Sequence, residues 1–166
     1  FGANLRGANL SNADLFGANL GGASLSVANL RGTRLSNTNL YHTSLIGAKL
    51  SNANLRGANL SEATLDYADL SNADLSDAFL FRTDLNGAKL QDVSLTNANL
   101  KNAEMRDANL IRADLTNSIL IGADLTNANL NDAELSGITA TNLRGCPSSL
   151  PKEWVCENNL LRELLI

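Results

Sequence analysis

Residues 3–15 read ANLRGANLSNADL, a stretch that places one apolar residue at every fifth position. This spacing suits neither an α-helix, which turns once every 3.6 residues, nor a flat strand, whose side chains alternate with a period of two. From Leu5 to Leu135 every fifth position is Leu except Met105, which gives 26 Leu in 27 slots without an insertion. Such a register indicates one structural unit repeated along most of the chain.

The repeated unit reads A-(N/D)-L-x-x. In an extended segment, residues two apart share a face, so Ala and Leu point the same way and the Asn or Asp between them points outward. The last two positions are rich in Gly, Ser, Asn and Asp, which favour turns. Each unit is thus a very short strand followed by a bend, which predicts a β-solenoid with coils about 4.8 Å apart. The first position of the unit, called here the small slot, is Ala in 21 of 27 units. The other six units hold Thr33, Thr38, Thr43, Thr83, Val93 or Ser118 there.

These repeats, which cover residues 1–135, resemble the pentapeptide-repeat family. The resemblance implies an all-β fold, a right-handed, four-sided parallel β-helix with four units per coil. A column filled with Leu side chains leaves no concave pocket in which catalytic groups could assemble. We therefore expect no enzyme, no cofactor and no metal site. The single histidine, His42, occupies a turn slot and is expected to be a solvated surface residue.

The repeat fades after Leu135, which divides the chain into a β-helix over residues 1–140 and a C-terminal cap over residues 141–166. Ser149 and Pro151 form a plausible helix start, and NNLLRELLI at residues 158–166 reads as a short amphipathic helix. We therefore expect two helices to close the C-terminal end. The N-terminal end is expected to be covered by residues upstream or by a second copy, which would give a homodimer.

Cys146 and Cys156 are the only two cysteines, and both lie in the expected cap. A disulfide, two packed free thiols and half of a metal site are all compatible with this spacing. The metal reading is poor, because no other soft ligand is near. A disulfide would indicate an oxidising compartment. The tail CPSSLPKEWVCEN, residues 146–158, also resembles the C-terminal segment of cyanobacterial pentapeptide-repeat proteins, some of which are exported. Periplasm or thylakoid lumen is therefore favoured over cytoplasm.

The formal net charge is −4, and it is distributed unevenly along the chain. Residues 1–60 carry a net charge of +4 and residues 61–135 a net charge of −8. No basic face indicates nucleic-acid binding, and no run of about 18 apolar residues indicates a membrane span. With a twenty-residue coil, two outward acidic columns form. A divalent cation could relieve their repulsion, although the simpler interpretation is a solubilising face with raised pKa values. The columns are Asp84, Glu104 and Asp124, and Asp74, Asp114 and Glu134 with Ser94 interrupting.

One side of the expected column carries apolar residues next to its buried Leu residues at every second coil. Few other outward slots are this apolar, and exposed apolar clusters often mark partner surfaces. The simpler alternative is a scatter of surface hydrophobic residues. The candidate partner surface, called here the apolar strip, consists of Tyr41, Phe79, Phe81, Ile119 and Ile121.

Two classes of non-enzymatic function remain. A rigid column with a mixed polar surface suits a protein-interaction or scaffold module with a protein partner. Some pentapeptide-repeat proteins, however, are similar to DNA in shape and charge and bind type II topoisomerases. The basic first coils, the small net charge and the cysteine pair weaken that second interpretation for this chain.

Overall fold

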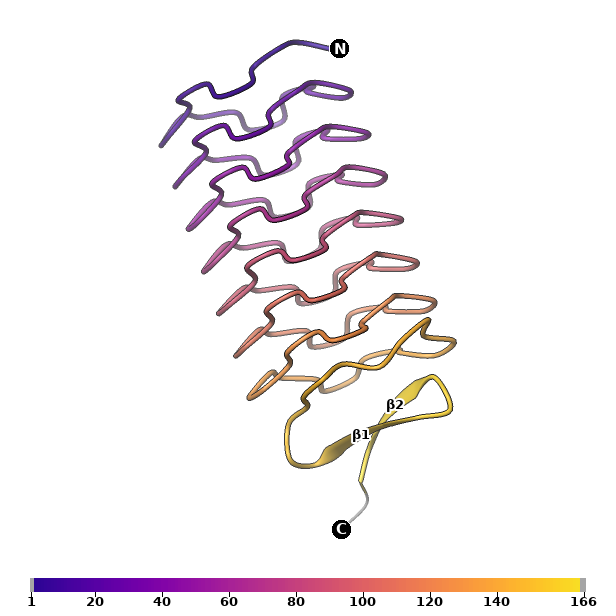
Figure 1. Cartoon of the computed structure of the whole chain (residues 1–166). Coiled ribbons are helices and arrows are strands. Elements are labelled where there is room, and N and C mark those ends of the chain that lie inside the picture. The colour runs from indigo at the N-terminus through magenta and orange to yellow at the C-terminus, as the bar shows by residue number, and fades with distance from the viewer. Residues whose placement is uncertain (1, 165–166) are drawn as a thin grey trace.

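The backbone forms a column of stacked coils, closed at its C-terminal end by a hairpin (Figure 1). The computed structural model describes residues 2–164. Parallel bridges join residues twenty apart, from Asn4 with Ser24 through to Ile119 with Thr139. Four such bridges occur per coil, one for each unit. The predicted solenoid and its twenty-residue, four-sided coil are therefore confirmed.

Each unit ends in a tight turn that the sequence specifies directly. The N–H of Ala8 donates to the carbonyl of Leu5 at 3.0 Å, and this contact recurs along the column. The second turn residue has a positive φ, as in Gly7 at 68° and Asn12 at 59°. A positive φ at this position is the mark of a type II turn, which explains the preference for Gly and Asn. The outward Asn supports the turn, since Asn9 Oδ1 accepts the N–H of Ser11 at 3.2 Å.

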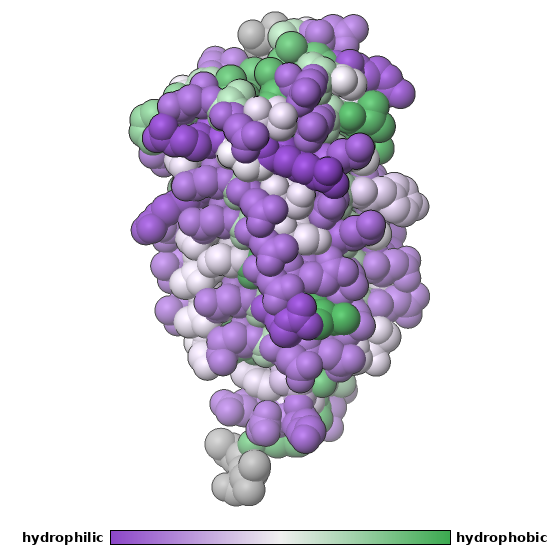
Figure 2. Space-filling model, turned by 90° about the vertical axis from the view of Figure 1, so that its left-hand side faces the viewer, coloured by the Kyte–Doolittle hydropathy of each residue, from purple (hydrophilic) through white to green (hydrophobic). Residues whose placement is uncertain are grey.

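The interior is a continuous stack of Leu and Ala side chains. From Leu25 to Leu135 the central Leu residues are at most 1% exposed, and Met105 takes their place once at 0%. Burial of one such side chain contributes about 2 kcal/mol before conformational entropy is subtracted. At the described end of the column near Gly2, hydrophobic residues reach the surface (Figure 2) and Leu5, Leu10, Leu15 and Leu20 are only partly buried. Coverage of that end by a second copy stays a prediction.

Polar residues in the small slot are accommodated in two ways. Thr83 is fully buried, and its hydroxyl donates to the carbonyl of Leu60 in the preceding coil at 2.8 Å. Thr33, Thr38 and Thr43 make the equivalent bond. Ser118 is equally buried, but its hydroxyl has no hydrogen-bond partner. The hydrogen-bonded threonine hydroxyl groups therefore stabilise the folded state, whereas the unpaired hydroxyl of Ser118 destabilises it.

The prediction of two C-terminal helices is wrong. Instead, β1 (Trp154–Glu157) pairs antiparallel with β2 (Leu160–Glu163). Asn158 and Asn159 join them with φ values of 48° and 62°, which fits the type I′ turn that a two-residue hairpin requires. The expected start at Ser149 and Pro151 leads into a turn, since Trp154 N–H donates to the Pro151 carbonyl at 3.0 Å. Residues 165 and 166 of the second expected helix lie outside the described residues.

The hairpin covers the last coil through one strand. Leu161 is 4% exposed, and its N–H donates to the carbonyl of Ala140 at 3.1 Å. The parallel ladder also continues past residue 140, with bridges to Gly145 and Ser149. The predicted boundary between a β-helix over residues 1–140 and a cap over residues 141–166 stays a prediction. Within residues 2–164 no helix is long and apolar enough to cross a membrane.

Candidate interaction surface

The apolar strip lies on one face of the column, as its twenty-residue spacing requires. Bridges place Asn99 directly between Phe79 and Ile119, so the two apolar residues are two coils apart. Their exposed fractions are 53% for Phe79 and 38% for Ile119. Tyr41 is also exposed, whereas Phe81 and Ile121 are half-buried. The structure thus places the five residues along one side without packing them into a single cluster.

Charged neighbours flank the aromatic members of the strip. The guanidinium of Arg82 lies 5.2 Å from the centre of the Phe81 ring, a distance at which a cation–π attraction operates. The hydroxyl of Tyr41 donates to Glu62 Oε2 at 2.9 Å. This hydrogen bond, with the negative charge of Glu62, raises the pKa of Tyr41. His42 is exposed beside Tyr41, with ring centres 6.0 Å apart.

A shallow groove of about 350 Å³ adjoins the strip. Sequence reasoning missed it, because it arises from short and amide side chains in neighbouring coils rather than from a motif. Aligning the chain at twenty residues would have shown Asn39, Asn59 and Phe79 in one column. The groove is lined by Asn37, Thr38, Asn39, Gly57, Asn59, Ser61 and Phe79.

Exposed apolar residues also occur in other turns of the column. Phe16 is 58% exposed and Tyr67 is 72% exposed. Val27 and Ile46 are exposed as well. Tyr67 lies close to Gly87, where an added Cβ atom would meet the ring at 2.7 Å. Phe16 and Tyr67 provide comparisons for the strip, since both are more exposed than Phe79 but lie in other turns of the coil.

The first acidic column forms as expected, with bridges from Asp84 to Glu104 and from Glu104 to Asp124. Arginines compensate much of its charge. Arg106 contacts Asp124 at 2.7 Å and Glu104 at 3.4 Å, while Arg144 contacts Glu104 at 2.5 Å. Burial, then the charges of Asp66 and Glu104, raise the pKa of Asp84. The column is therefore a mixed network of acids and arginines.

The second column also forms, with Asp74, Ser94, Asp114 and Glu134 in successive coils, so that one hydroxyl group interrupts its carboxylates. Asp74 and Asp114 are bridged on either side of Ser94. Burial acts to raise the pKa of Asp114, but hydrogen bonds from the hydroxyl and backbone N–H of Thr116 and from the Thr96 hydroxyl hold it below its ordinary value. Asp124, in the first column, behaves in the same way. Burial acts to raise its pKa, but hydrogen bonds from Thr126 and then from Arg106 lower it. The expectation of raised pKa values is thus wrong for these two carboxyl groups.

Among residues 2–164, no group of three or more His, Cys, Asp or Glu is arranged to hold a metal ion.

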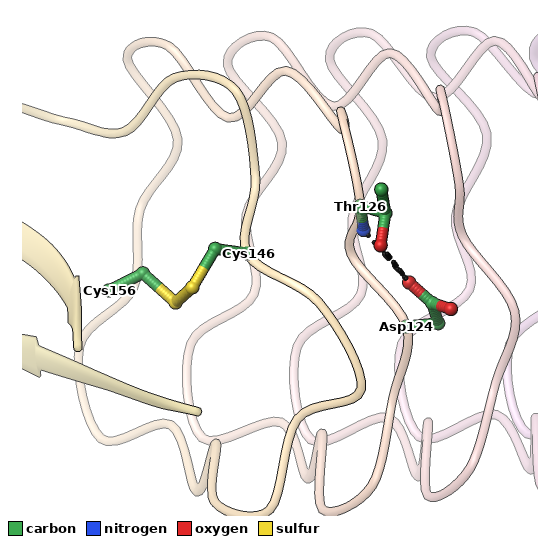
Figure 3. Close-up of a disulfide and its surroundings, with 4 residues drawn as sticks. All are labelled: Asp124, Thr126, Cys146 and Cys156. Carbon is green, nitrogen blue, oxygen red and sulfur yellow. Dashed lines mark hydrogen bonds between the residues drawn. A yellow bond between two sulfur atoms is a disulfide. The ribbon is translucent and has the colours of Figure 1, made fainter. Parts of the chain in front are cut away.

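The two cysteines form a disulfide, with Cα atoms 5.9 Å apart. It ties the chain that leaves the last coil to strand β1 of the hairpin (Figure 3). In a neighbouring coil the Thr126 hydroxyl donates to Asp124 Oδ1 at 2.6 Å. The disulfide therefore fixes the cap to the column. Cys146 and Cys156 are thus neither free thiols nor half of a metal site in this structure.

Comparisons with known proteins agree with this architecture. The family model "Pentapeptide repeats" matches residues 2–32, 18–57, 43–80, 78–117 and 108–146, with eight copies. The chain belongs to the pentapeptide-repeat family, whose members are right-handed, four-sided β-helices and are generally structural or interaction modules rather than enzymes. No curated protein matches the chain in sequence.

Several solved structures are similar to this chain. HetL, involved in heterocyst differentiation regulation in the cyanobacterium Nostoc, is 34% identical over 84% of this chain and 71% of its own, with a TM-score of 0.49. A trypsin-treated form of QnrB1, a plasmid-mediated fluoroquinolone resistance protein, is 20% identical over 79% of this chain and 76% of its own, with a TM-score of 0.68. A pentapeptide-repeat protein of the Arabidopsis thaliana thylakoid lumen is 29% identical over 64% of this chain and 71% of its own, with a TM-score of 0.48.

Proposed function

We propose that this chain is a non-enzymatic protein-interaction module whose apolar strip binds a protein partner. The observation that carries the proposal is the exposure of Phe79, 53%, on the flat face of a hydrogen-bonded column. The backbone around it is fixed, since Phe79 N–H donates to the carbonyl of Ala58 and its carbonyl accepts from Leu60. Because this backbone is already ordered, a partner that covers the ring orders only the side chain, and more of the gain from burying the ring contributes to affinity.

The experiment compares partner capture by three forms of the protein. The wild-type chain, immobilised through its N-terminus, is exposed to extract from its own organism, and bound proteins are identified by mass spectrometry. A double change of Phe79 and Phe81 to Ser is expected to abolish capture of the partner. The matched control changes Phe16 and Tyr67 to Ser, which removes two aromatic rings that are more exposed than Phe79 and Phe81 and lie in other turns.

Retention of all bound proteins by the Phe79 and Phe81 variant would contradict the proposal. Equal loss in both variants would also contradict it, because general stickiness of exposed rings would then explain the capture. Circular dichroism of each variant verifies that the column is intact.

We infer further that the module works in an oxidising compartment, periplasm or thylakoid lumen rather than cytoplasm. The disulfide between Cys146 and Cys156 supports this inference, because such bonds persist mainly outside reducing compartments. Fractionation of cells, with alkylation of free thiols before lysis, tests it. Recovery of the protein with both thiols alkylated would contradict the inference.

The alternative of a DNA mimic that binds a type II topoisomerase is not favoured. Mimicry of phosphates requires a continuous acidic face, whereas Arg106 and Arg144 contact the carboxylates of the first column. The likeness to QnrB1, at 20% identity, concerns the fold alone. A gyrase supercoiling assay is expected to show no inhibition by this protein.

A further inference from the structure

The groove beside the strip runs along three stacked positions of one face. Asn39 bridges to Asn59, and Asn59 bridges to Phe79, so the three side chains rise by one coil, about 4.8 Å, at each step. Asn37 lies over Gly57, and its side chain fills the space that a Cβ atom at Gly57 would need. The groove therefore offers an amide-lined surface that ends at an exposed aromatic ring.

Amide groups in this groove retain hydrogen-bonding capacity. Asn59 Oδ1 accepts the N–H of Ser61 at 3.1 Å, and its two amide N–H donors have no partner among residues 2–164. The Asn37 side chain makes no hydrogen bond to another described residue. A side-chain amide presents donors and acceptors close together, which allows it to pair with two neighbouring hydroxyl groups of one ligand.

No lining residue of the groove is charged. The nearest guanidinium in the sequence, that of Arg56, contacts Asp77 at 3.0 Å. Ligands that depend on phosphate or carboxylate groups would find no counter-charge here, because recognition of such groups uses Arg or Lys. The groove thus favours a neutral, hydroxyl-rich ligand.

The backbone along the groove is already saturated. The N–H groups of Asn39, Asn59 and Phe79 donate to carbonyls of the preceding coil at 2.9 to 3.0 Å. An extended peptide that adds a strand needs free backbone groups at a sheet edge, and this face offers none. Recognition must therefore come from side chains.

We propose that this groove binds a neutral oligosaccharide, with one pyranose ring packed on Phe79 and its hydroxyl groups paired with Asn59 and Asn37. The C–H face of a pyranose is apolar and its rim is polar, which matches an exposed ring beside amide groups. This ligand class goes beyond the protein partner proposed above, and only Phe79 is shared between the two sites.

The test is a titration of the full chain with cellohexaose, maltohexaose and chitohexaose, followed by amide NMR shifts and calorimetry. At least one of these neutral sugars is expected to shift resonances of the groove, while hexagalacturonate, which is charged, does not. Asn59→Asp keeps the oxygen that accepts from Ser61 but removes the two donors, and is expected to weaken binding at least about tenfold. Asp fills the equivalent slot elsewhere, at Asp69 and Asp74, so the variant is expected to fold.

Asn99→Asp is the matched control, since Asn99 lies on the same face, accepts the N–H of Lys101 in the same way, and is outside the groove. It is expected to bind as the wild type does. Phe79→Leu keeps an apolar side chain but removes the ring, and is also expected to weaken binding about tenfold.

Absence of groove shifts with all three neutral sugars at millimolar concentration would overturn the proposal, as would equal weakening by Asn59→Asp and Asn99→Asp. Shifts in the same groove with a neutral polar peptide, but with none of the sugars, would overturn it too. Phe81→Ser leaves the groove lining intact, so its effect on partner capture is read separately from sugar binding.

Discussion

Ser118→Ala is expected to stabilise the column, although it removes a polar group and adds no contact. Ser118 occupies the small slot, which holds Ala in most units, and its buried hydroxyl has no partner. Leaving such a group unpaired costs about 1–3 kcal/mol. Replacement by Ala removes this cost without opening a sizeable cavity, so we expect the free energy of unfolding to rise by about 1–2 kcal/mol.

Thr83→Ala is the matched change with the opposite sign. Thr83 fills the same slot, but its hydroxyl donates to the Leu60 carbonyl at 2.8 Å. Loss of this hydrogen bond costs about 1 kcal/mol and loss of a buried methyl group about 0.8 kcal/mol. The Leu60 carbonyl keeps the N–H of Ala63 as a donor at 3.0 Å, so no orphan acceptor adds to the cost. We therefore expect a decrease of about 2 kcal/mol.

Guanidinium unfolding followed by circular dichroism measures both effects, with midpoints converted through a common m-value. The two variants are expected to differ by about 3–4 kcal/mol in unfolding free energy. Ala113→Ser provides a second control, because it adds a hydroxyl to a fully buried slot and is expected to destabilise. A lower midpoint for Ser118→Ala would refute the reasoning, since it would show that the hydroxyl bonds to a carbonyl as that of Thr83 does.

Three further perturbations address the cap and the acidic column. Replacement of both Cys146 and Cys156 by Ser opens an 11-residue loop and is expected to lower the unfolding free energy by about 2.8 kcal/mol, measured by guanidinium unfolding; unchanged stability would show that the hairpin holds without the bond. Asp84→Asn is expected to raise the melting temperature at pH 7 but not below about pH 3.8. Burial and nearby carboxylates raise the pKa of Asp84, so the folded state binds the proton of Asp84 more tightly than the unfolded state does. The stabilisation that this proton gives at low pH is lost as the pH rises through the pKa of the folded state. A constant difference across pH would contradict this cause. Calcium titration is expected to leave the melting temperature unchanged, because Arg106 and Arg144 already contact the carboxylates; a rise at low millimolar calcium would contradict that compensation.

The column could be predicted from sequence because one five-residue unit repeats its own chemistry. The central Leu residues from Leu25 to Leu135 are buried, outward Asn and Asp side chains support many of the turns, and most turn residues with positive φ are Gly, Asn or Asp. The number of units per coil did not follow from this local chemistry and came from the family resemblance. Once the coil length is known, bridged neighbours such as Phe79 and Asn99 can be read directly from the sequence.

The cap was misread because its leucines resemble the pattern of an amphipathic helix. The decisive signal was Asn158-Asn159, two residues that tolerate the positive φ of a type I′ turn and that separate two short runs of strand-compatible residues. A packed helix would also lack the contact by which the N–H of Leu161 pairs with the last coil. Tertiary pairing with the exposed end of the ladder therefore decided between helix and strand.

The candidate surface was only partly predictable. The apolar strip follows from a twenty-residue alignment, but the groove depends on how side chains of adjacent coils pack against one another, as Asn37 does over Gly57. The compensation of the acidic column by Arg144 was not visible either, because this residue lies forty positions from Glu104 in the sequence.

Site-specific photocrosslinking tests most directly whether the apolar strip is the surface that binds a partner. Benzoylphenylalanine replaces Phe79 in one variant and the equally exposed Phe16 in another, and both are irradiated in extract from the protein's own organism. The account predicts one discrete crosslinked protein from position 79 and none from position 16. Identical crosslinking patterns from the two positions, or no crosslink from position 79, would contradict it.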